Sequence, residues 1–276
     1  MQQLLMNTKA FMAEAIHSQN PNPNPPPHET FHRFFDTWIT QQNTYLEELV
    51  SAAKNHNHDQ NGDDDDALVP LIERVVRHYE QYYHEKSDWE RRDALAMLTP
   101  SWRSNLEDAF LWIGGWRPTL AVHLLYSKSG IQLDDKLEDL IRGLTTGDLG
   151  DLTPDQVKQI DELQKRTIHE ERVFTEKLAK LQESVADRSM VEISNAVSEM
   201  IRRGNVAGNE AKVQSTLNSK NDEIETLLHM ADDLRLEVLK AVVELLTPIQ
   251  AVYFLIAAAE LHLRLHEWGK KWSPQN

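Results

Sequence analysis

Apolar residues recur along this chain at the spacing of an α-helix, and this periodicity constrains the fold more than any other feature. One stripe consists of Phe31, Phe34, Phe35, Trp38, Tyr45 and Leu49, and a second of Leu68, Leu71, Ile72, Val75, Val76 and Tyr79. Steps of three and four residues place such side chains on one side of a helix. No segment alternates apolar and polar residues between hairpin turns. The sequence therefore predicts an all-α fold, a single multi-helix domain of long antiparallel helices.

Local signals mark some helix ends. Thr153-Pro154-Asp155 reads as a helix start, because Thr caps well, Pro suits the first helical position and an acid suits the first turn. The last helix is expected to run from about Ile249 to Trp268 and to end at Gly269, since glycine is the preferred residue just past a helix.

Two polar segments suggest boundaries. The proline-dense run 20–27 has no helical potential, so we predict a disordered tail and linker over 1–28, a domain over 29–272 and a short tail over 273–276. A second break over 55–66 ends in four aspartates and reads as a solvated loop whose acidic end caps the next helix.

Composition excludes several function classes. The net charge of -15 argues against broad charge-driven binding to nucleic acid or to anionic membranes. With 0 Cys, thiolate metal sites and Cys nucleophiles are excluded. No catalytic motif is present, so no enzyme activity and no catalytic residue is predicted. The chain start lacks the features of a signal peptide and the apolar run 253–259 is too short to span a membrane, which favours the nucleus or cytoplasm.

Residues 100–118 form the most distinctive segment. It contains three tryptophans and a Gly114-Gly115 pair, which permits positive φ and close approach of the backbone. Such a segment favours a tightly packed elbow in the core, because large aromatic side chains usually serve packing. The alternative is a partly open aromatic groove with Arg103 or Arg117 as its polar anchor.

Within this segment, Trp112, Gly114, Gly115, Arg117 and Pro118 match an A-x-x-W-x-G-G-x-R-P pattern. It resembles the core of the plant seed-dormancy control domain, found in the delay-of-germination family and at the C-terminal end of TGA-type bZIP factors. Further similar blocks are Phe35, Trp38, Gln42 and Leu49, residues 76–82, residues 149–156, residues 231–235 and 245–251, and residues 261–269. The resemblance covers about 29–272.

The resemblance implies a non-enzymatic regulatory protein of seed dormancy and of abscisic-acid or developmental signalling. Such relatives self-associate and bind type 2C protein phosphatases and haem. Because Lys9 is the sole Lys or Arg before residue 29, we expect the stand-alone form, without DNA binding through a bZIP. The alternatives are a transcription co-regulator that pairs with TGA-type bZIP factors, and a pollen or developmental patterning factor at the cell periphery.

His262 and His266 are the candidate cofactor residues. Four residues apart on a helix, their imidazoles share one face and could hold one metal centre. They also match the Leu-His-x-x-x-His-Glu-Trp-Gly segment of haem-binding family members, so the resemblance implies haem; no other metal is predicted. The alternative places both histidines in solvent beside a core stripe of Leu261, Leu265, Trp268 and Trp272.

Phe35 and Trp38 are the candidate partner-binding residues. The first helix carries more aromatic surface than one helix end normally needs, and the equivalent segment of the relatives contributes to phosphatase docking. The alternative is that this helix simply covers the core.

Overall fold

The computed structural model describes residues 27–58, 65–128, 152–203 and 210–272. The helices are α2 (Pro27–His58), α3 (Asp65–Leu98), α4 (Asn105–Asp108), α5 (Thr119–Lys128), α7 (Pro154–Glu183), α8 (Arg188–Arg203), α9 (Glu210–Leu245) and α10 (Pro248–Trp272), and a 3-10 turn, η1 (Ser184–Ala186), joins α7 to α8. These described residues contain no strand, which confirms the all-α prediction.

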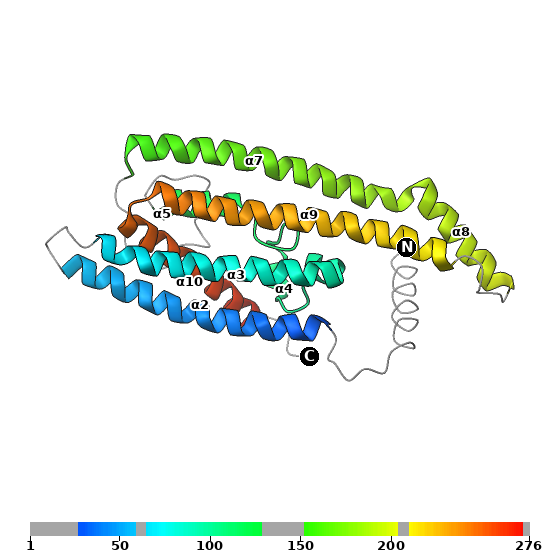
Figure 1. Ribbon diagram of the computed structural model, residues 1–276, viewed down its shortest axis with the longest axis horizontal. Helices are drawn as coiled ribbons and strands as arrows, with labels where there is room; N and C mark the ends of the chain where they lie inside the picture. The colour runs from blue at the N-terminus through cyan, green and yellow to red at the C-terminus, as the bar shows by residue number, and fades with distance from the viewer. Residues whose placement is uncertain (1–26, 59–64, 129–151, 204–209, 273–276) are drawn as a thin grey trace.

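The long helices lie side by side in the order α7, α9, α3 and α2, and neighbours run in opposite directions (Figure 1). α10 crosses behind them and contacts α2, α3, α4, α5 and α9. α10 therefore packs across one side of this layer and joins elements that are far apart in the sequence.

The core includes much of both stripes that the periodicity predicted, with Phe34, Tyr45, Leu71, Val76 and Tyr79 partly buried at its edge. Phe31, Phe35 and Leu49 on α2 have no exposed surface, and Leu68, Ile72 and Val75 on α3 are buried against them. In α10 the apolar residues from Val252 to Leu265 fill the centre. Within the described ranges, no helix combines the length and the apolar character that crossing a bilayer requires.

The first helix begins at Pro27, two residues inside the segment predicted as tail, because proline fits the first turn of a helix. Residues 1–26 and 273–276, on which the tail predictions fall, lie outside the described residues. Most of the predicted acidic loop, 59–64, also lies outside them, whereas α2 continues through Asn55 to His58.

The predicted start of α7 is confirmed. Thr153 accepts a hydrogen bond from the Gln156 backbone N–H at 3.2 Å, and the Gln156 side chain accepts one from the Thr153 N–H at 3.0 Å. Pro154 occupies the first turn. This reciprocal capping satisfies two amide groups that the helix itself leaves unpaired.

The predicted helix end at Gly269 is wrong. α10 continues to Trp272, and Gly269 is buried inside its last turns. A Cβ at this position would lie 1.8 Å from Ser104 Oγ and 2.5 Å from Ser104 Cβ. The glycine thus lets α10 approach the start of α4, and its role is close packing rather than capping.

Replacing Gly269 with Ala should destabilise the protein by about 1–3 kcal/mol, the usual cost of overpacking, although Gly→Ala normally stabilises a helix. Urea unfolding of Gly269→Ala, Ser104→Gly and the double variant measures this effect. The cost of the alanine should fall in the Ser104→Gly background. An equal loss of unfolding free energy in both backgrounds would show that the added methyl group does not collide with Ser104.

Candidate functional site

The Gly114-Gly115 pair forms a tight turn between α4 and α5. The Trp112 N–H donates to the Gly115 carbonyl at 2.7 Å, and Ile113 and Gly114 have φ values of 47° and 68°. A Cβ on Gly114 would lie 2.6 Å from the Met97 carbonyl oxygen. Residues 112–116, called the elbow below, therefore need glycine at this point both for backbone conformation and for space.

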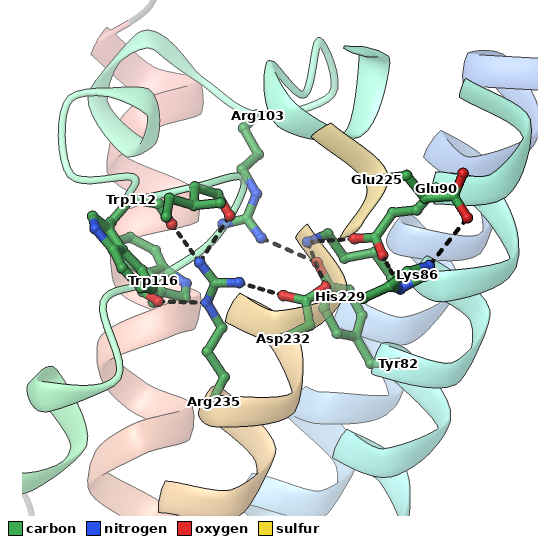
Figure 2. A network of polar contacts seen from close by, with 11 residues as sticks. Tyr82, Lys86, Glu90, Arg103, Trp112, Trp116, Glu225, His229, Asp232 and Arg235 are labelled. Carbon is green, nitrogen blue, oxygen red and sulfur yellow. Dashed lines mark hydrogen bonds and ion pairs between the residues drawn. The ribbon is translucent and has the colours of Figure 1, made fainter. Parts of the chain in front are cut away.

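Arg235 of α9 holds the elbow in place (Figure 2). Its Nε donates to the Trp116 carbonyl at 2.6 Å, and its Nη2 donates to the carbonyls of Ile113, at 2.9 Å, and of Trp112. A Cβ on Gly115 would lie 2.8 Å from the Arg235 Cζ. Gly115 thus makes room for the guanidinium that binds the elbow.

Arg235 belongs to a buried charge network between α3 and α9 (Figure 2). Asp232 pairs with Arg235 and accepts a hydrogen bond from Lys86 Nζ at 2.7 Å. Lys86, which is 1% exposed, also lies 3.2 Å from Glu90 Oε1, and His229 Nδ1 lies 2.8 Å from Glu90 Oε2. Burial raises the pKa of Glu90 to about 8 despite the opposing charge of Lys86. Glu90 thus links Lys86 of its own helix to His229 of α9.

The remaining residues of the family core motif join the elbow to α7. The Trp112 indole N–H donates to Thr175 Oγ1 at 2.9 Å. The Thr119 N–H at the start of α5 donates to Glu171 Oε1 at 2.7 Å. Arg117 lies over the Trp112 ring and 3.7 Å from Glu171, whereas Pro118 is buried just before α5. These contacts, with the buried rings of Trp102 and Trp112, agree with the packed elbow. The alternative is met in part, because Arg103 and Trp116 line a small cavity beside the elbow, whereas Arg117 does not.

Both histidines of α10 face the interior, so the alternative that placed them in solvent is wrong. His266 is 4% exposed, and the His262 ring lies 5.4 Å from Trp38 and 5.9 Å from Trp116, measured between ring centroids. Burial lowers the pKa of His262 to about 3. Trp272, assigned to the core stripe by that alternative, is 79% exposed.

His266 is bound to α4 through Glu107. Its Nδ1 lies 3.2 Å and 3.3 Å from the two carboxylate oxygens of Glu107, which is fully buried. Glu107 also accepts hydrogen bonds from the Ser104 N–H and hydroxyl, at 2.9 Å and 2.8 Å. Burial alone would raise the pKa of Glu107, but the bonds from His266 and Ser104 lower it to about 2.

Phe35 and Trp38 lie in the core, as the alternative interpretation of α2 expects. Phe35 is 0% exposed and Trp38 is 4% exposed. The Trp38 indole N–H donates to the His78 carbonyl at 3.2 Å, and the two rings stack with centroids 4.7 Å apart. In this conformation neither side chain reaches the surface, and their direct contact with a partner stays a prediction.

Haem does not fit the described conformation. The Nε2 atoms of His262 and His266 are buried without a hydrogen-bond partner, which suits a ligand role. The cavity beside His262, however, has a volume of only about 40 Å³. The rings of Phe35, Trp38 and Trp116 surround His262 with centroids 6.4, 5.4 and 5.9 Å away. A porphyrin would need the space that these rings fill.

The sequence did not indicate the buried charges. Lys86 and Glu90 are four residues apart, and Asp232 and Arg235 are three apart, which is the spacing of ordinary surface ion pairs. The available signal was their position among apolar neighbours in the helical stripe, which places them on the buried side.

Glu107→Gln should make stability less dependent on pH. The folded-state pKa of Glu107 is depressed, so its stabilisation is complete above about pH 4.5 and is lost as the pH falls toward 2. The variant should be less stable than wild type at pH 7 by on the order of 2–3 kcal/mol, and the gap should shrink in acid.

Urea unfolding at pH 7, 4.5 and 3 measures the gap. Glu267→Gln is a suitable control, because Glu267 is half-exposed and pairs only with Arg264 on the surface. A Glu107→Gln deficit that stayed constant from pH 7 to pH 3 would rule out the charge of Glu107 as its cause.

Comparison with known proteins agrees with the resemblance. A family model described as seed dormancy control (DOG1) matches residues 45–127. Protein DOG1-like 3 from Arabidopsis thaliana is 31% identical over 240 residues, which are 84% of this chain and 81% of that protein. Protein DOG1-like 1 from the same plant is 31% identical over 256 residues, or 86% and 87% of the two chains. Transcription factor TGA5 from Arabidopsis thaliana is 27% identical over 85% of this chain but only 62% of that factor. The chain therefore belongs to the seed dormancy control family and is similar to TGA transcription factors over a shared domain.

Proposed function

We propose that this chain is a non-enzymatic regulatory protein of seed dormancy and of related abscisic-acid or developmental signalling. It acts in the nucleus or cytoplasm by binding other proteins, with type 2C protein phosphatases as the first partner class. The observation that carries the proposal is the similarity to Protein DOG1-like 3 over 84% of the chain. The buried charges support the non-enzymatic part of the proposal. Lys86, Asp232 and Arg235 bind one another and the elbow, and so they have a structural role.

The partner surface that we propose lies on the turn from α7 to α8. Val185 is 66% exposed and Val191 is 49% exposed, and they lie on η1 and α8 in the part of the molecule that projects beyond α2 and α3 (Figure 1). Exposed apolar patches often mark protein contacts, and we propose that Val185 and Val191 belong to one such patch. This surface is accessible without unfolding, whereas Phe35 and Trp38 are not.

Binding of a purified type 2C phosphatase, measured by calorimetry, tests the proposal. Val185→Glu/Val191→Glu should weaken binding by about tenfold or more, since charge is poorly tolerated in the centre of an interface. Leu95→Glu is the matched control, because Leu95 is 55% exposed but lies on α3, outside the proposed surface. This variant should bind the phosphatase as wild type does.

Circular dichroism of each variant confirms the fold before binding is compared. Absence of binding by the wild-type chain would overturn the partner class. Normal binding by the folded double variant would overturn the surface but leave the partner class standing.

A second candidate is a transcription co-regulator that pairs with TGA-type bZIP factors. The similarity to TGA5 over 85% of this chain favours it, since related domains often associate through the same surfaces. Capture of a TGA factor, rather than a phosphatase, from seed extract would favour this candidate. Self-association of the chain stays a prediction.

Haem binding through His262 and His266 also stays a prediction, and it requires α2 to move away from α10. The test is a haem titration followed by the Soret band, with wild type and His262→Ala/His266→Ala compared. A Soret shift in wild type that the double variant loses would support it. Equal spectra for the two proteins would contradict it.

A further inference from the structure

A small cavity lies against the elbow, between α3, α9 and α10. Its charged lining comprises Lys86, Arg103, Arg235 and a single carboxylate, Asp232. Lys86 and Arg235 both pair with that carboxylate. The lining therefore carries three cations and one anion, and Arg103 is the cation that Asp232 does not pair with.

Arg103 is buried with much of its hydrogen-bonding capacity unused. Arg103 is 8% exposed, and its Nη2 donates to the Tyr82 hydroxyl at 3.2 Å. Its Nε and Nη1 have no hydrogen-bond partner, and its Cζ lies 5.4 Å from the Phe35 ring centroid and 5.7 Å from the Trp116 ring centroid. No carboxylate of the described residues lies at ion-pair distance from it. Glu107 and Asp108 are near enough to sense its charge, but the Glu107 oxygens are bound by Ser104 and His266, and Asp108 is exposed to solvent.

Other groups around the cavity are also mostly donors. The Trp116 indole N–H is buried and has no partner. The Tyr82 hydroxyl oxygen accepts from Arg103, so its own proton is available to donate. His262 Nε2 is unpaired as well, and the lowered pKa of His262 keeps this imidazole neutral near pH 7.

An acceptor that also carries negative charge matches this lining better than water does. A buried, unpaired guanidinium costs several kcal/mol, and a counter-ion removes that cost while water only supplies hydrogen bonds. The volume of about 40 Å³ admits roughly three water-sized groups. The ligand is therefore very small.

We propose that this cavity binds a small monovalent anion, of the size of chloride or formate, with Arg103 as its counter-ion and the Trp116 N–H as a second donor. The anion supplies a counter-charge to Arg103, which has no ion-pair partner among the described residues, and thereby stabilises the packing of the elbow on α3 and α10. This site is independent of the protein partner proposed above.

Thermal unfolding in sodium chloride or sodium formate, against sodium gluconate at equal ionic strength, tests the site. Gluconate is too large for the cavity and controls for salt effects on the surface. In wild type the melting temperature should rise by roughly 3 °C for each tenfold increase in chloride or formate above the dissociation constant. In gluconate it should not rise in this way.

Arg103→Met should abolish the difference between the salts, and Trp116→Phe should reduce it while keeping an aromatic ring. Arg117→Gln is the matched control, because Arg117 is half-exposed and does not line the cavity. It should respond as wild type does. A salt difference that persisted in folded Arg103→Met, or its absence in wild type, would overturn the proposal.

Crystals of the wild-type chain grown in sodium bromide provide a measurement that needs no variant. Bromide replaces chloride and gives an anomalous signal, expected within hydrogen-bond distance of Arg103 Nε or Nη1 and of Trp116 Nε1. A cavity that contained only ordered water under these conditions would show that no anion is bound, and the proposal would be wrong.

Discussion

The fold depends on one buried guanidinium. Arg235 donates to the carbonyls of Trp112, Ile113 and Trp116, which lie 119 to 123 residues away in the sequence. Carbonyls in an irregular, buried turn have no helical partner, and leaving them unpaired would cost about as much as lost hydrogen bonds. The Trp112 carbonyl also accepts from the Gly115 N–H at 3.3 Å, whereas those of Ile113 and Trp116 accept from the Arg235 guanidinium that α9 supplies. Gly115 completes the arrangement, because any side chain there would collide with the guanidinium.

Because Arg235, which donates to the elbow carbonyls, is charged, the interior around it must contain further charged groups. Arg235 needs Asp232, and Asp232 also accepts from Lys86, so the α3–α9 interface contains charges where most bundles contain apolar residues. Glu90 lies 3.2 Å from Lys86 on the other side, and burial raises the pKa of Glu90 to about 8 despite that cation. The interior consequently contains charged side chains of both signs, among them Lys86, Arg235 and Asp232. Removing one member of such a network is more damaging than replacing the whole network with apolar residues, since a charge is then buried without a partner.

Sequence reasoning succeeded where the signal is local or periodic. The apolar stripe through Phe35 and the cap at Thr153 were both predicted, because they depend on residues within a few positions of each other. It failed at Gly269, because a glycine needed for contact with a distant helix looks the same in sequence as one that ends a helix. Lys86 failed in the same way. A lysine four residues from a glutamate is typical of a solvated helix surface, whereas in the fold α9 covers Lys86 and supplies Asp232 as its partner.

His262 and His266, the predicted cofactor residues, are part of the core packing in this structure. Periodicity placed His262 and His266 on one face, but both neighbours of His262 are leucines, so the sequence did not establish which face is buried. In the structure His266 binds Glu107, which caps α4, and His262 packs under Trp38 of α2. A ligand as large as a porphyrin would have to displace the aromatic rings around His262, and so it competes with the closed packing of α2 for the same volume. Binding of such a ligand would therefore be coupled to separation of α2 from α10. Any interaction that stabilises the closed core would lower the affinity for the ligand.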